Sequence, residues 1–324
     1  MGVSESERLA RLAKDLAGQC GFELAGIAPA EPLAEAAWYQ EWVRRGFAGA
    51  MSYLVGRRAE VRLDPRLLLS TARSIVCLGR LYNGPEPYST GYSEPGHGWI
   101  SRYAWGEDYH QVIHGGLRRL AAGLRDALGR PFDWKACVDT APLLERAYAR
   151  RAGLGWIGKN SCLINQQGGS WYFLAALLVS LEMQPDSPPA DRCGSCTRCI
   201  DACPTRAIVP ARYEGGPSFT VDSRRCISYL TIELRGEIPS ELQPAVGRNI
   251  FGCDICQDVC PWNRKAPVTA DPALSAVHFA PPLDDLTALS ADRFREMFAR
   301  SSINRAGYRG LQRNVTIARG NSGL

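Results

Sequence analysis

The sequence predicts an α+β fold, and three observations support this prediction. Helix-like and strand-like segments alternate up to about residue 184, a pattern typical of mixed architectures. A proline-rich linker starts at Pro185, and eight of the twelve cysteines follow between Cys193 and Cys260. A helical stretch resumes near Leu286. We therefore expect three segments: a first domain over 1–184, a cysteine-rich domain over 185–266, and a short, basic helical segment over 267–324.

The elements of the first domain are predicted from hydrophobic periodicity. Apolar residues recur at helical spacing in four stretches, 6–19, 33–45, 108–128 and 142–152. Pro142 lies in the first turn of the last of these, where proline is favoured. Strands are expected at 22–27, 74–81, 132–138 and 171–181. The stretch 83–98 is rich in Gly, Pro, Tyr and Ser and is expected to be a loop.

Composition excludes some classes of protein. The 324 residues are 45% hydrophobic and 22% charged, as in an ordinary globular protein. No apolar run reaches the roughly 18 residues needed to span a bilayer, and the N-terminal region has neither an apolar signal core nor a twin-arginine pair. We therefore expect a cytoplasmic protein without a membrane partner. The net charge of +5 treats the thiols as neutral.

The cysteines form two groups with a recognisable spacing. The group 193–204 follows the C-x2-C-x2-C-x3-C-P run of bacterial ferredoxins, in which the fourth cysteine ligates the other cluster. The group 253–261 lacks one cysteine of this run, and Cys226 is the obvious substitute. Crossed ligation then predicts two [4Fe-4S] clusters: cluster one takes Cys193, Cys196, Cys199 and Cys260, and cluster two takes Cys203, Cys226, Cys253 and Cys256.

Zinc is the alternative, because it also favours C-x2-C pairs. It explains neither the two C-P endings nor the triple spacing. Two clusters with four thiolates each would reduce the net charge to roughly +1, so a polyanionic partner has to be argued from local patches. Because the chain is much longer than a dicluster ferredoxin requires, we expect the clusters to supply electrons to a redox site in the first domain.

A glycine-rich stretch, 153–160, matches G-x-G-x-x-G and nearly matches the P-loop pattern. Both patterns require a strand before and a helix after, whereas here a helix precedes and a strand follows, so we reject both nucleotide interpretations. A close backbone approach to a large ligand and a simple tight turn are equally favoured.

Asp139 is the main catalytic candidate. It ends a predicted strand and could act as a general acid if an apolar site raises its pKa. The alternative is a cap for the helix expected from Pro142, and the pattern alone favours the cap. His110 and His114 are four residues apart but lack the intervening Glu of a metalloprotease motif, so we interpret them as surface or core residues. The remaining cysteines share no spacing and are interpreted as buried free thiols: Cys20, Cys77, Cys137 and Cys162.

Two arginine-rich stretches are candidates for contact with a phosphate backbone. The first comprises Arg57, Arg58, Arg62, Arg66 and Arg73, and the second comprises Arg300, Arg305, Arg309, Arg313 and Arg319. A solvated helix face is the alternative, and the pattern alone favours it.

Taken together, the chain resembles the epoxyqueuosine reductases, cobalamin-dependent iron–sulfur enzymes of the last step of queuosine formation on tRNA. Besides both cysteine groups, the residues that carry the resemblance are 101–110, 138–142, 145–146, 153–161, 225–229, 249–253 and 308–314. The resemblance implies that 1–184 is a nitroreductase-like, cobalamin-binding catalytic domain related to that of the reductive dehalogenases. It places base-off cobalamin, without a histidine ligand, against the stretch 153–161 and next to cluster one.

The resemblance also implies roles for residues and partners. Asp139 matches the proton donor, and the expected cofactor contacts are Arg62, Arg102, Asp139, Gly158, Lys159, Asn160 and Cys162. The expected partners are a tRNA that bears epoxyqueuosine and an external electron donor, and we expect a monomer. Many relatives carry further helical repeats that help to hold tRNA, whereas this chain ends at Leu324. The argument for tRNA therefore depends on the arginine stretches and on a domain cleft.

Two other functions stay open from the sequence. A reductive dehalogenase would share cobalamin and two clusters but usually carries a twin-arginine export signal. A non-catalytic electron carrier or RNA-binding protein would hold no cobalamin.

Overall fold

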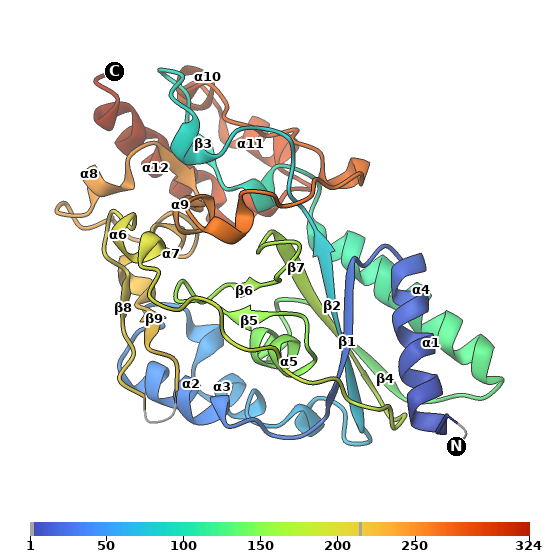
Figure 1. Cartoon of the computed structure of the whole chain (residues 1–324). Helices are drawn as coiled ribbons and strands as arrows, with labels where there is room; N and C mark the ends of the chain where they lie inside the picture. The colour runs from blue at the N-terminus through green and yellow to red at the C-terminus, as the bar shows by residue number, and fades with distance from the viewer. Residues whose placement is uncertain (1–2, 214–215) are drawn as a thin grey trace.

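An antiparallel sheet forms the centre of the first domain in the computed structural model, which describes residues 3–213 and 216–324. Its four strands lie in the order β1-β2-β7-β4 (Figure 1). They are β1 (Leu24–Pro29), β2 (Ser74–Leu81), β7 (Tyr172–Val179) and β4 (Trp134–Cys137). The strand expected at 74–81 is confirmed to the residue, and the other three have shifted ends. The long central strands β2 and β7 are almost wholly buried, which explains their continuous apolar sequences.

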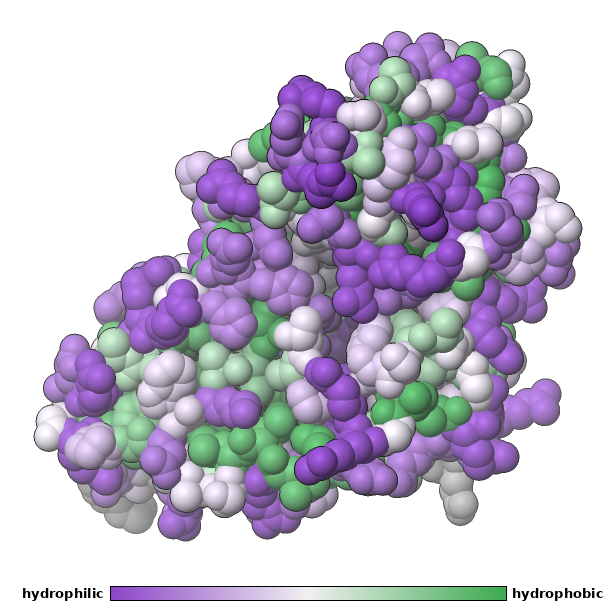
Figure 2. All heavy atoms as spheres, turned by 180° about the vertical axis from the view of Figure 1, so that it is seen from behind, coloured by the Kyte–Doolittle hydropathy of each residue, from purple (hydrophilic) through white to green (hydrophobic). Residues whose placement is uncertain are grey.

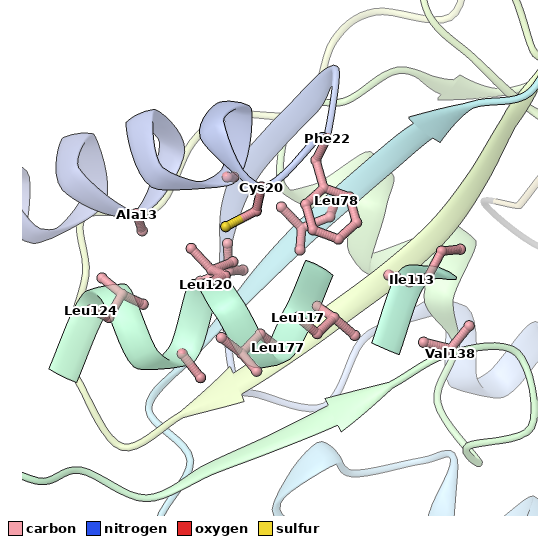
Figure 3. Packing of buried hydrophobic residues seen from close by; sticks show 14 of the residues in the cluster. Ala13, Cys20, Phe22, Leu78, Ile113, Leu117, Leu120, Leu124, Val138 and Leu177 are labelled. Carbon is pink, nitrogen blue, oxygen red and sulfur yellow. The ribbon is translucent and has the colours of Figure 1, made fainter. Parts of the chain in front are cut away.

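Two helices, α1 (Glu5–Gln19) and α4 (Tyr109–Leu128), cover one face of this sheet (Figure 1). A capping box of Ser4 and Glu7 starts α1. Figure 3 shows how Leu117, Leu120 and Leu124 of α4 pack between α1 and the sheet, and all three side chains are fully buried. This packing fixes the position of α4, and with it the N-terminal turn that carries His110.

The other face of the sheet is covered by α5 (Glu145–Arg151). The helix starts three residues later than the sequence predicted from Pro142. The reason lies in the preceding turn, where Asp139 has a left-handed backbone (φ 43°) and Leu143 closes a tight turn onto the carbonyl of Ala141. A small hairpin of β5 (Trp156–Ile157) and β6 (Leu163–Ile164) follows α5. The glycine-rich stretch therefore does run from a helix into a strand.

Shorter elements surround this core. They are α2 (Glu35–Arg44) and α3 (Arg57–Val61), with 3-10 turns η1 (Ser52–Leu54), η2 (Pro65–Leu67), η3 (Ser89–Gly91) and η4 (Arg102–Ala104). The expected loop 83–98 contains only η3.

The cysteine-rich region consists of short elements joined by long loops. Its helices are α6 (Arg198–Asp201), α7 (Ile227–Ile232), α8 (Gln243–Val246) and α9 (Ile255–Asp258). Its strands are β8 (Ile208–Pro210), β9 (Phe219–Val221) and β10 (Asn249–Phe251), and its 3-10 turns are η5 (Ser223–Arg225) and η6 (Pro261–Asn263). Short elements of this kind leave loop backbone free to wrap around clusters.

The C-terminal segment is helical, as expected. It contains η7 (Pro272–Leu274), α10 (Leu283–Thr287), α11 (Ala291–Met297), η8 (Ser302–Ala306) and α12 (Gly307–Asn321). Its apolar core also includes Trp99 and Ile100 of β3 (Trp99–Ile100), which pairs in parallel with β10. Packing thus crosses the expected boundaries near 184 and 266, and these boundaries stay predictions. In the part of the chain that the structure describes, none of the helices has the length and apolar character required to cross a bilayer.

Candidate active site

Asp139 lies two residues beyond the end of β4, and its side chain points toward solvent. Its side chain is 61% exposed, although Cys137 and Val138 before it are buried. Its positive φ of 43° is unusual for a residue other than glycine and indicates backbone held under strain. The interpretation of Asp139 as a helix cap is wrong, because α5 begins at Glu145 and its N-cap residue, Leu144, receives no side-chain hydrogen bond.

His110, from the first turn of α4, faces Asp139. Its Nε2 lies 3.4 Å from Oδ2 of Asp139, and its Nδ1 lies 2.7 Å from Oδ1 of Asp108. The same oxygen of Asp108 caps α4 by accepting the backbone N–H of His110 at 3.0 Å. The ring of Tyr109 stacks on that of His110, with centroids 4.2 Å apart. The helix cap and the stacking together fix the imidazole in place.

The two facing groups change each other's proton affinity. Hydrogen bonds to Asp108 and then to Asp139 raise the pKa of His110 to about 9. Burial alone would raise the pKa of Asp139, but the hydrogen bond and charge of His110 outweigh it and hold that pKa below its ordinary value. This direction is opposite to the one that the general-acid interpretation assumed.

Glu145 is a second carboxyl group beside Asp139. Burial and the charge of Asp139 raise its pKa to about 8, so that it is mainly protonated at neutral pH. Its Oε1 is buried without a hydrogen-bond partner. A buried polar atom without a partner beside the exposed Asp139 indicates a place for a polar ligand.

Two further polar groups near Asp139 come from distant parts of the chain. The charge of Asp139 acts on Tyr53 from η1 and on Arg305 from η8, and Arg305 forms an ion pair with Glu233 at 2.9 Å. Figure 2, which views the molecule from behind, shows a hollow near the middle of that face with hydrophilic side chains around it. Charged groups of the sheet domain and of the C-terminal segment thus lie within electrostatic reach of each other at this site.

The cysteines predicted for cluster one are neighbours in space. Burial and the charges of Cys193, Cys260 and Cys196 raise the pKa of the Cys199 thiol to about 11. Burial and the charges of Cys193 and Cys196 also raise the pKa of Cys260, although Cys260 comes from the other sequence group.

The cysteines predicted for cluster two are also neighbours. Burial and then the charges of Cys226 and Cys203, among others, raise the pKa of Cys253. The charges of Cys253 and Cys226 are in turn among the causes that raise the pKa of Cys256. Helices α6 and α9, which carry one cysteine group each, pack together. This arrangement is the crossed one, and the assignment of individual ligands stays a prediction.

The donor set fits clusters better than a single ion. Among residues 3–213 and 216–324, no three His, Cys, Asp or Glu side chains close around one metal ion. A four-iron cube holds its four thiolates further apart than one zinc ion does, and thiolates are its usual ligands.

The hairpin turn 158–162 contacts both cysteine groups. Nζ of Lys159 donates to the carbonyls of Gly194 (2.7 Å) and Cys196 (2.9 Å). Nδ2 of Asn160 donates to the carbonyl of Cys256 at 3.3 Å, and the Cys162 thiol is in hydrogen-bonding contact with the thiol of Cys256. Cys162 is therefore not an isolated buried thiol like Cys20, Cys77 and Cys137.

Two of the predicted cofactor contacts already have protein partners. Arg62 is 5% exposed and donates to the carbonyls of Tyr53 and Arg58. Arg102 is 2% exposed and donates to three carbonyls of the loop that starts at Gly84. Gly158 is tightly packed, since a Cβ there would lie 2.6 Å from Ile164. The predicted cofactor roles of these residues stay predictions.

Most arginines of the two arginine-rich stretches are not free to bind phosphate, because they already have partners within the protein. Arg66 and Arg73 form ion pairs with Asp64 and Glu182, and Arg58 donates to the carbonyl of Thr140. In the second stretch most side chains are paired or buried as well; the ion pairs are Arg300–Glu107, Arg305–Glu233 and Arg319–Asp284, and Arg313 donates to three carbonyls.

One cavity is lined by arginines that come from separate segments of the chain. It measures about 540 Å³, lies at the start of α12 and is lined by Arg235, Arg295 and Arg309. A smaller cavity of about 130 Å³ lies beside Trp99 and Arg248. Sequence reasoning did not single out Arg235 or Arg295, because they come from separate segments that meet only in the fold.

His110 and Glu145 were also missed as site residues. The only sequence signal was their place in the motifs 101–110 and 145–146. The spacing of His110 and His114 led us to interpret both as surface or core residues, because the Glu of a metalloprotease motif is missing. Burial and the charge of Arg118 lower the pKa of His114, which is not part of the site.

Comparisons with known proteins agree with this site. The family model described as "4Fe-4S double cluster binding domain" matches residues 192–263. The family model described as "Epoxyqueuosine reductase QueG, DUF1730" matches residues 62–140. A catabolic reductive dehalogenase shares the fold over 82% of this chain and 33% of its own, with 20% identity and a TM-score of 0.50. Fold and site thus define an iron–sulfur oxidoreductase that carries two [4Fe-4S] clusters on a dehalogenase-like fold.

Closer relatives define the family. An epoxyqueuosine reductase of Cellulophaga algicola is 40% identical over 97% of this chain and 99% of its own length. A crystal structure of epoxyqueuosine reductase with an epoxyqueuosine-modified tRNA-Tyr stem loop matches 97% of this chain and 82% of its own, with 31% identity and a TM-score of 0.84. The reductase of Bacillus subtilis, solved with an aspartate catalytic loop swung out of the active site, matches 97% and 82% with 30% identity and a TM-score of 0.81. The chain belongs to the epoxyqueuosine reductase family.

Proposed function

We propose that this protein reduces epoxyqueuosine to queuosine in tRNA, with electrons relayed through the two clusters to cobalamin and a proton delivered through Asp139. The observation that carries the proposal is the position of Asp139, exposed on a strained turn between His110 and Glu145, in a chain that matches this family over its length. Two electrons and two protons convert the epoxide into an alkene and water.

The polar groups of the site suit a polar cofactor such as cobalamin. Oε1 of Glu145 is buried without a partner beside the exposed Asp139, and Tyr53 and Arg305 lie within electrostatic reach of Asp139. When bound, cobalamin would supply a strongly reducing metal centre for the opening of the epoxide. The residues that would hold it are Asp139 and the stretch 153–161, with the other expected contacts already named.

The chain itself would supply the proton path and the electron path. Asp139 would place a proton on the epoxide oxygen, so that it leaves as water rather than as hydroxide. The charge of Arg146 helps to lower the pKa of both Asp139 and Cys162, and Cys162 in turn helps to raise the pKa of Cys256 and of Cys260, one from each predicted cluster set. The site and the predicted cluster ligands thus lie within electrostatic reach of one another, which supports a short electron path.

Replacement of Asp139 by Asn tests the proton role. We expect Asp139→Asn to keep the iron–sulfur and corrinoid absorption of the wild-type protein and to lose conversion of epoxyqueuosine in tRNA, as measured by mass spectrometry of the nucleosides. Asp133→Asn, at the opposite end of β4 and remote from His110, is the matched control and should stay active. Full activity of Asp139→Asn would rule out its role as proton donor.

We further propose that the tRNA contacts the cavity lined by Arg235, Arg295 and Arg309. Arg309 is exposed and has no acidic partner among the described residues, and the first turn of α12 adds backbone N–H groups that favour an anion. A tRNA substrate would also place the reaction in the cytoplasm, and the electron donor and the monomeric state stay predictions.

Arg309→Ala tests this surface. The affinity for a tRNA stem loop should fall, and the slope of log K against log salt should become shallower by about 1, as expected for one lost phosphate contact. Arg130→Ala, at the far end of α4, is the control. An unchanged affinity and slope in Arg309→Ala would place the tRNA elsewhere.

The dehalogenase alternative has support at the level of fold alone, since its identity of 20% contrasts with 40% for an epoxyqueuosine reductase. A protein without cobalamin, as the electron-carrier alternative requires, would show no corrinoid absorption after reconstitution.

A further inference from the structure

The Asp108–His110–Asp139 arrangement has a consequence for where the catalytic proton resides. Asp108 accepts the backbone N–H of His110 at the start of α4, and this cap fixes the carboxylate. The same Oδ1 lies 2.7 Å from Nδ1 of the ring. An ionised carboxylate only accepts hydrogen bonds, so Nδ1 must be the donor and carry a hydrogen.

The other ring nitrogen then faces a second acceptor. Nε2 of His110 lies 3.4 Å from Oδ2 of Asp139 and is buried, with no other hydrogen-bond partner. If both were unprotonated, two lone pairs would oppose each other without water between them. One proton must therefore reside on one of these two atoms.

We propose that His110, oriented by Asp108, stores this proton in the resting enzyme and passes it to Asp139 during each turnover. The step transfers one proton from Nε2 of the imidazolium to Oδ2 of the carboxylate, which leaves a neutral imidazole and a neutral carboxyl group. Solvent then restores the proton on Nε2. The inference builds on the proposed role of Asp139, and His110 acts only through Asp139, as a positioning and proton-storing residue.

The charges around the pair favour storage on the histidine. Asp108 and Asp139 face the imidazole from the start of α4 and from the end of β4, and both raise the pKa of His110. Tyr109 stacks on the ring, and His114 lies one turn further along α4. On the side of α5, Glu145 and Arg146 face Asp139, and the hydrogen bond and charge of His110 hold the pKa of Asp139 low. At neutral pH the resting pair is therefore imidazolium and carboxylate.

The family relative with a swung-out aspartate loop is consistent with this arrangement, since such a loop would carry the carboxyl group between a storage position and a delivery position. In this chain Asp139 is exposed and its backbone is strained, whereas His110 is fixed by stacking and by the helix cap. A fixed store and a movable carrier are the two parts that such a relay requires.

Three variants separate storage from a merely structural role. His110→Gln keeps an N–H donor toward Asp139 but cannot exchange a proton, so we expect a loss of about a hundredfold in steady-state turnover. The wild-type rate should fall above about pH 9, where His110 loses its proton, and this alkaline limb should be absent in His110→Gln. Asp108→Asn removes the partner that raises the pKa of His110 most, so the limb should move to lower pH.

His114→Gln, one turn along the same helix, is the control and should keep both rate and limb. If Asp108 had only a structural role, Asp108→Asn would lower turnover equally at every pH, and the alkaline limb of the pH profile would not move. Added imidazole should restore part of the activity of His110→Ala, which is not expected of a lost packing contact.

A second readout does not depend on turnover. With histidine labelled in cluster-loaded protein, the resonance that disappears in His110→Gln should titrate well above the ordinary value near 6.5, and in Asp139→Asn it should titrate closer to that value. A wild-type resonance that titrates near 6.5, or a His110→Gln enzyme with wild-type rate and limb, would overturn the inference. Full activity of Asp139→Asn would instead remove the proposed role of Asp139 itself, so the two failures can be told apart.

Discussion

At the scale of single residues, proton affinities in the site are set by burial and by the nearest charge. Asp139 is ionised, and the hydrogen bond and charge of His110 hold its pKa below the ordinary value, whereas Glu145 is kept neutral because its carboxyl group is buried beside that same negative charge. Two carboxyl groups within one site thus have their pKa values pushed apart, a pattern that marks catalytic acids and bases.

Glu145 provides a test of this account through stability. The folded-state pKa of about 8 lies above the unfolded value near 4.5, so the protein loses stability as pH rises from 4.5 to 8 and the buried carboxyl is forced to ionise. Glu145→Gln is neutral at every pH and lacks this loss. Its melting temperature relative to wild type should therefore be higher at pH 8.5 than at pH 6.

The exposed Glu237→Gln serves as the control and should show no such difference between the two pH values. Equal effects of Glu145→Gln at pH 6 and pH 8.5 would show that Glu145 ionises freely in the folded protein.

The sequence allowed some of these residues to be predicted and not others. The cluster cysteines could be identified because ligand spacing is local along the chain. Asp139 was found as a candidate, but its environment was predicted wrongly, since His110 reaches it only when the start of α4 meets the end of β4 in the fold. Neither hydrophobic periodicity nor motif spacing reports a contact of that kind.

At the scale of elements, the site depends on how closely α5 packs on the sheet. Gly26 of β1 lies against the carbonyl of Ala152 just after α5, so that a Cβ at this position would collide with backbone. Gly26→Ala should therefore displace α5, lower the melting temperature and reduce turnover, because Glu145 and Arg146 move with the helix.

Gly18→Ala is the matched control within α1. A Cβ there meets nothing within 4 Å, and alanine is favoured over glycine in a helix by up to about 1 kcal/mol. This variant should be neutral or slightly more stable in thermal unfolding. A Gly26→Ala protein as stable and active as Gly18→Ala would contradict the packing described here.

The hairpin turn 158–162 is expected to tune the clusters. Lys159 holds an ammonium group against two carbonyls of the loop that carries Cys193 and Cys196. A nearby positive charge favours the reduced, more negative cluster. Lys159→Gln should therefore lower the reduction potential of one cluster by about 59 mV, a tenfold change in a one-electron equilibrium.

Redox titration followed by electron paramagnetic resonance would measure this shift, with the exposed Lys135→Gln as control. Equal shifts in both clusters, or none in either, would show that the ammonium group does not act on one cluster selectively. The helix before this turn and the long strand after it were predicted to within a few residues, but the hairpin of β5 and β6 was not predicted. The contacts of Lys159 were not predicted either, since the family resemblance suggested a cofactor role instead.

At the scale of the whole molecule, the cluster region and the first domain share buried polar contacts. Asp254, between Cys253 and Cys256, is 1% exposed and accepts hydrogen bonds from Trp99 (3.1 Å), Ser101 and the backbone of Arg102 (2.8 Å). The parallel pair β3–β10 lies beside it. A prediction by segments did not foresee this crossing, because each segment was assigned from its own pattern.

Asp254→Ala should couple the loss of these contacts to the loss of a cluster. Three buried donors would lose their acceptor, at about 1–3 kcal/mol each, so the midpoint of urea unfolding should fall and iron should be released earlier than from wild type. Asp254→Asn keeps part of the acceptor set and should be affected less. Iron retention equal to wild type in Asp254→Ala would show that the two regions are not coupled here.

The arginines that lie together in the folded molecule differ from those that lie together along the sequence. Most residues of the two stretches that suggested a phosphate-binding surface are paired with acids or buried. The cavity at α12 is lined by arginines from three separate segments. Arg235 donates to two carbonyls and Arg295 pairs with Asp292, whereas Arg309 has no acidic partner among the described residues. Charge patterns along the chain thus indicated a basic C-terminal region but not the residues within it that stay available.

The central claim is that the clusters, cobalamin and the Asp139 site form one reductase for epoxyqueuosine in tRNA. The most direct measurement is mass spectrometry of nucleosides after incubation of reconstituted protein with reductant and an epoxyqueuosine-bearing tRNA stem loop, with and without cobalamin. The account predicts a queuosine nucleoside lighter by one oxygen atom, formed only when cobalamin is present. Unchanged epoxyqueuosine with fully loaded protein, or equal conversion without cobalamin, would contradict it.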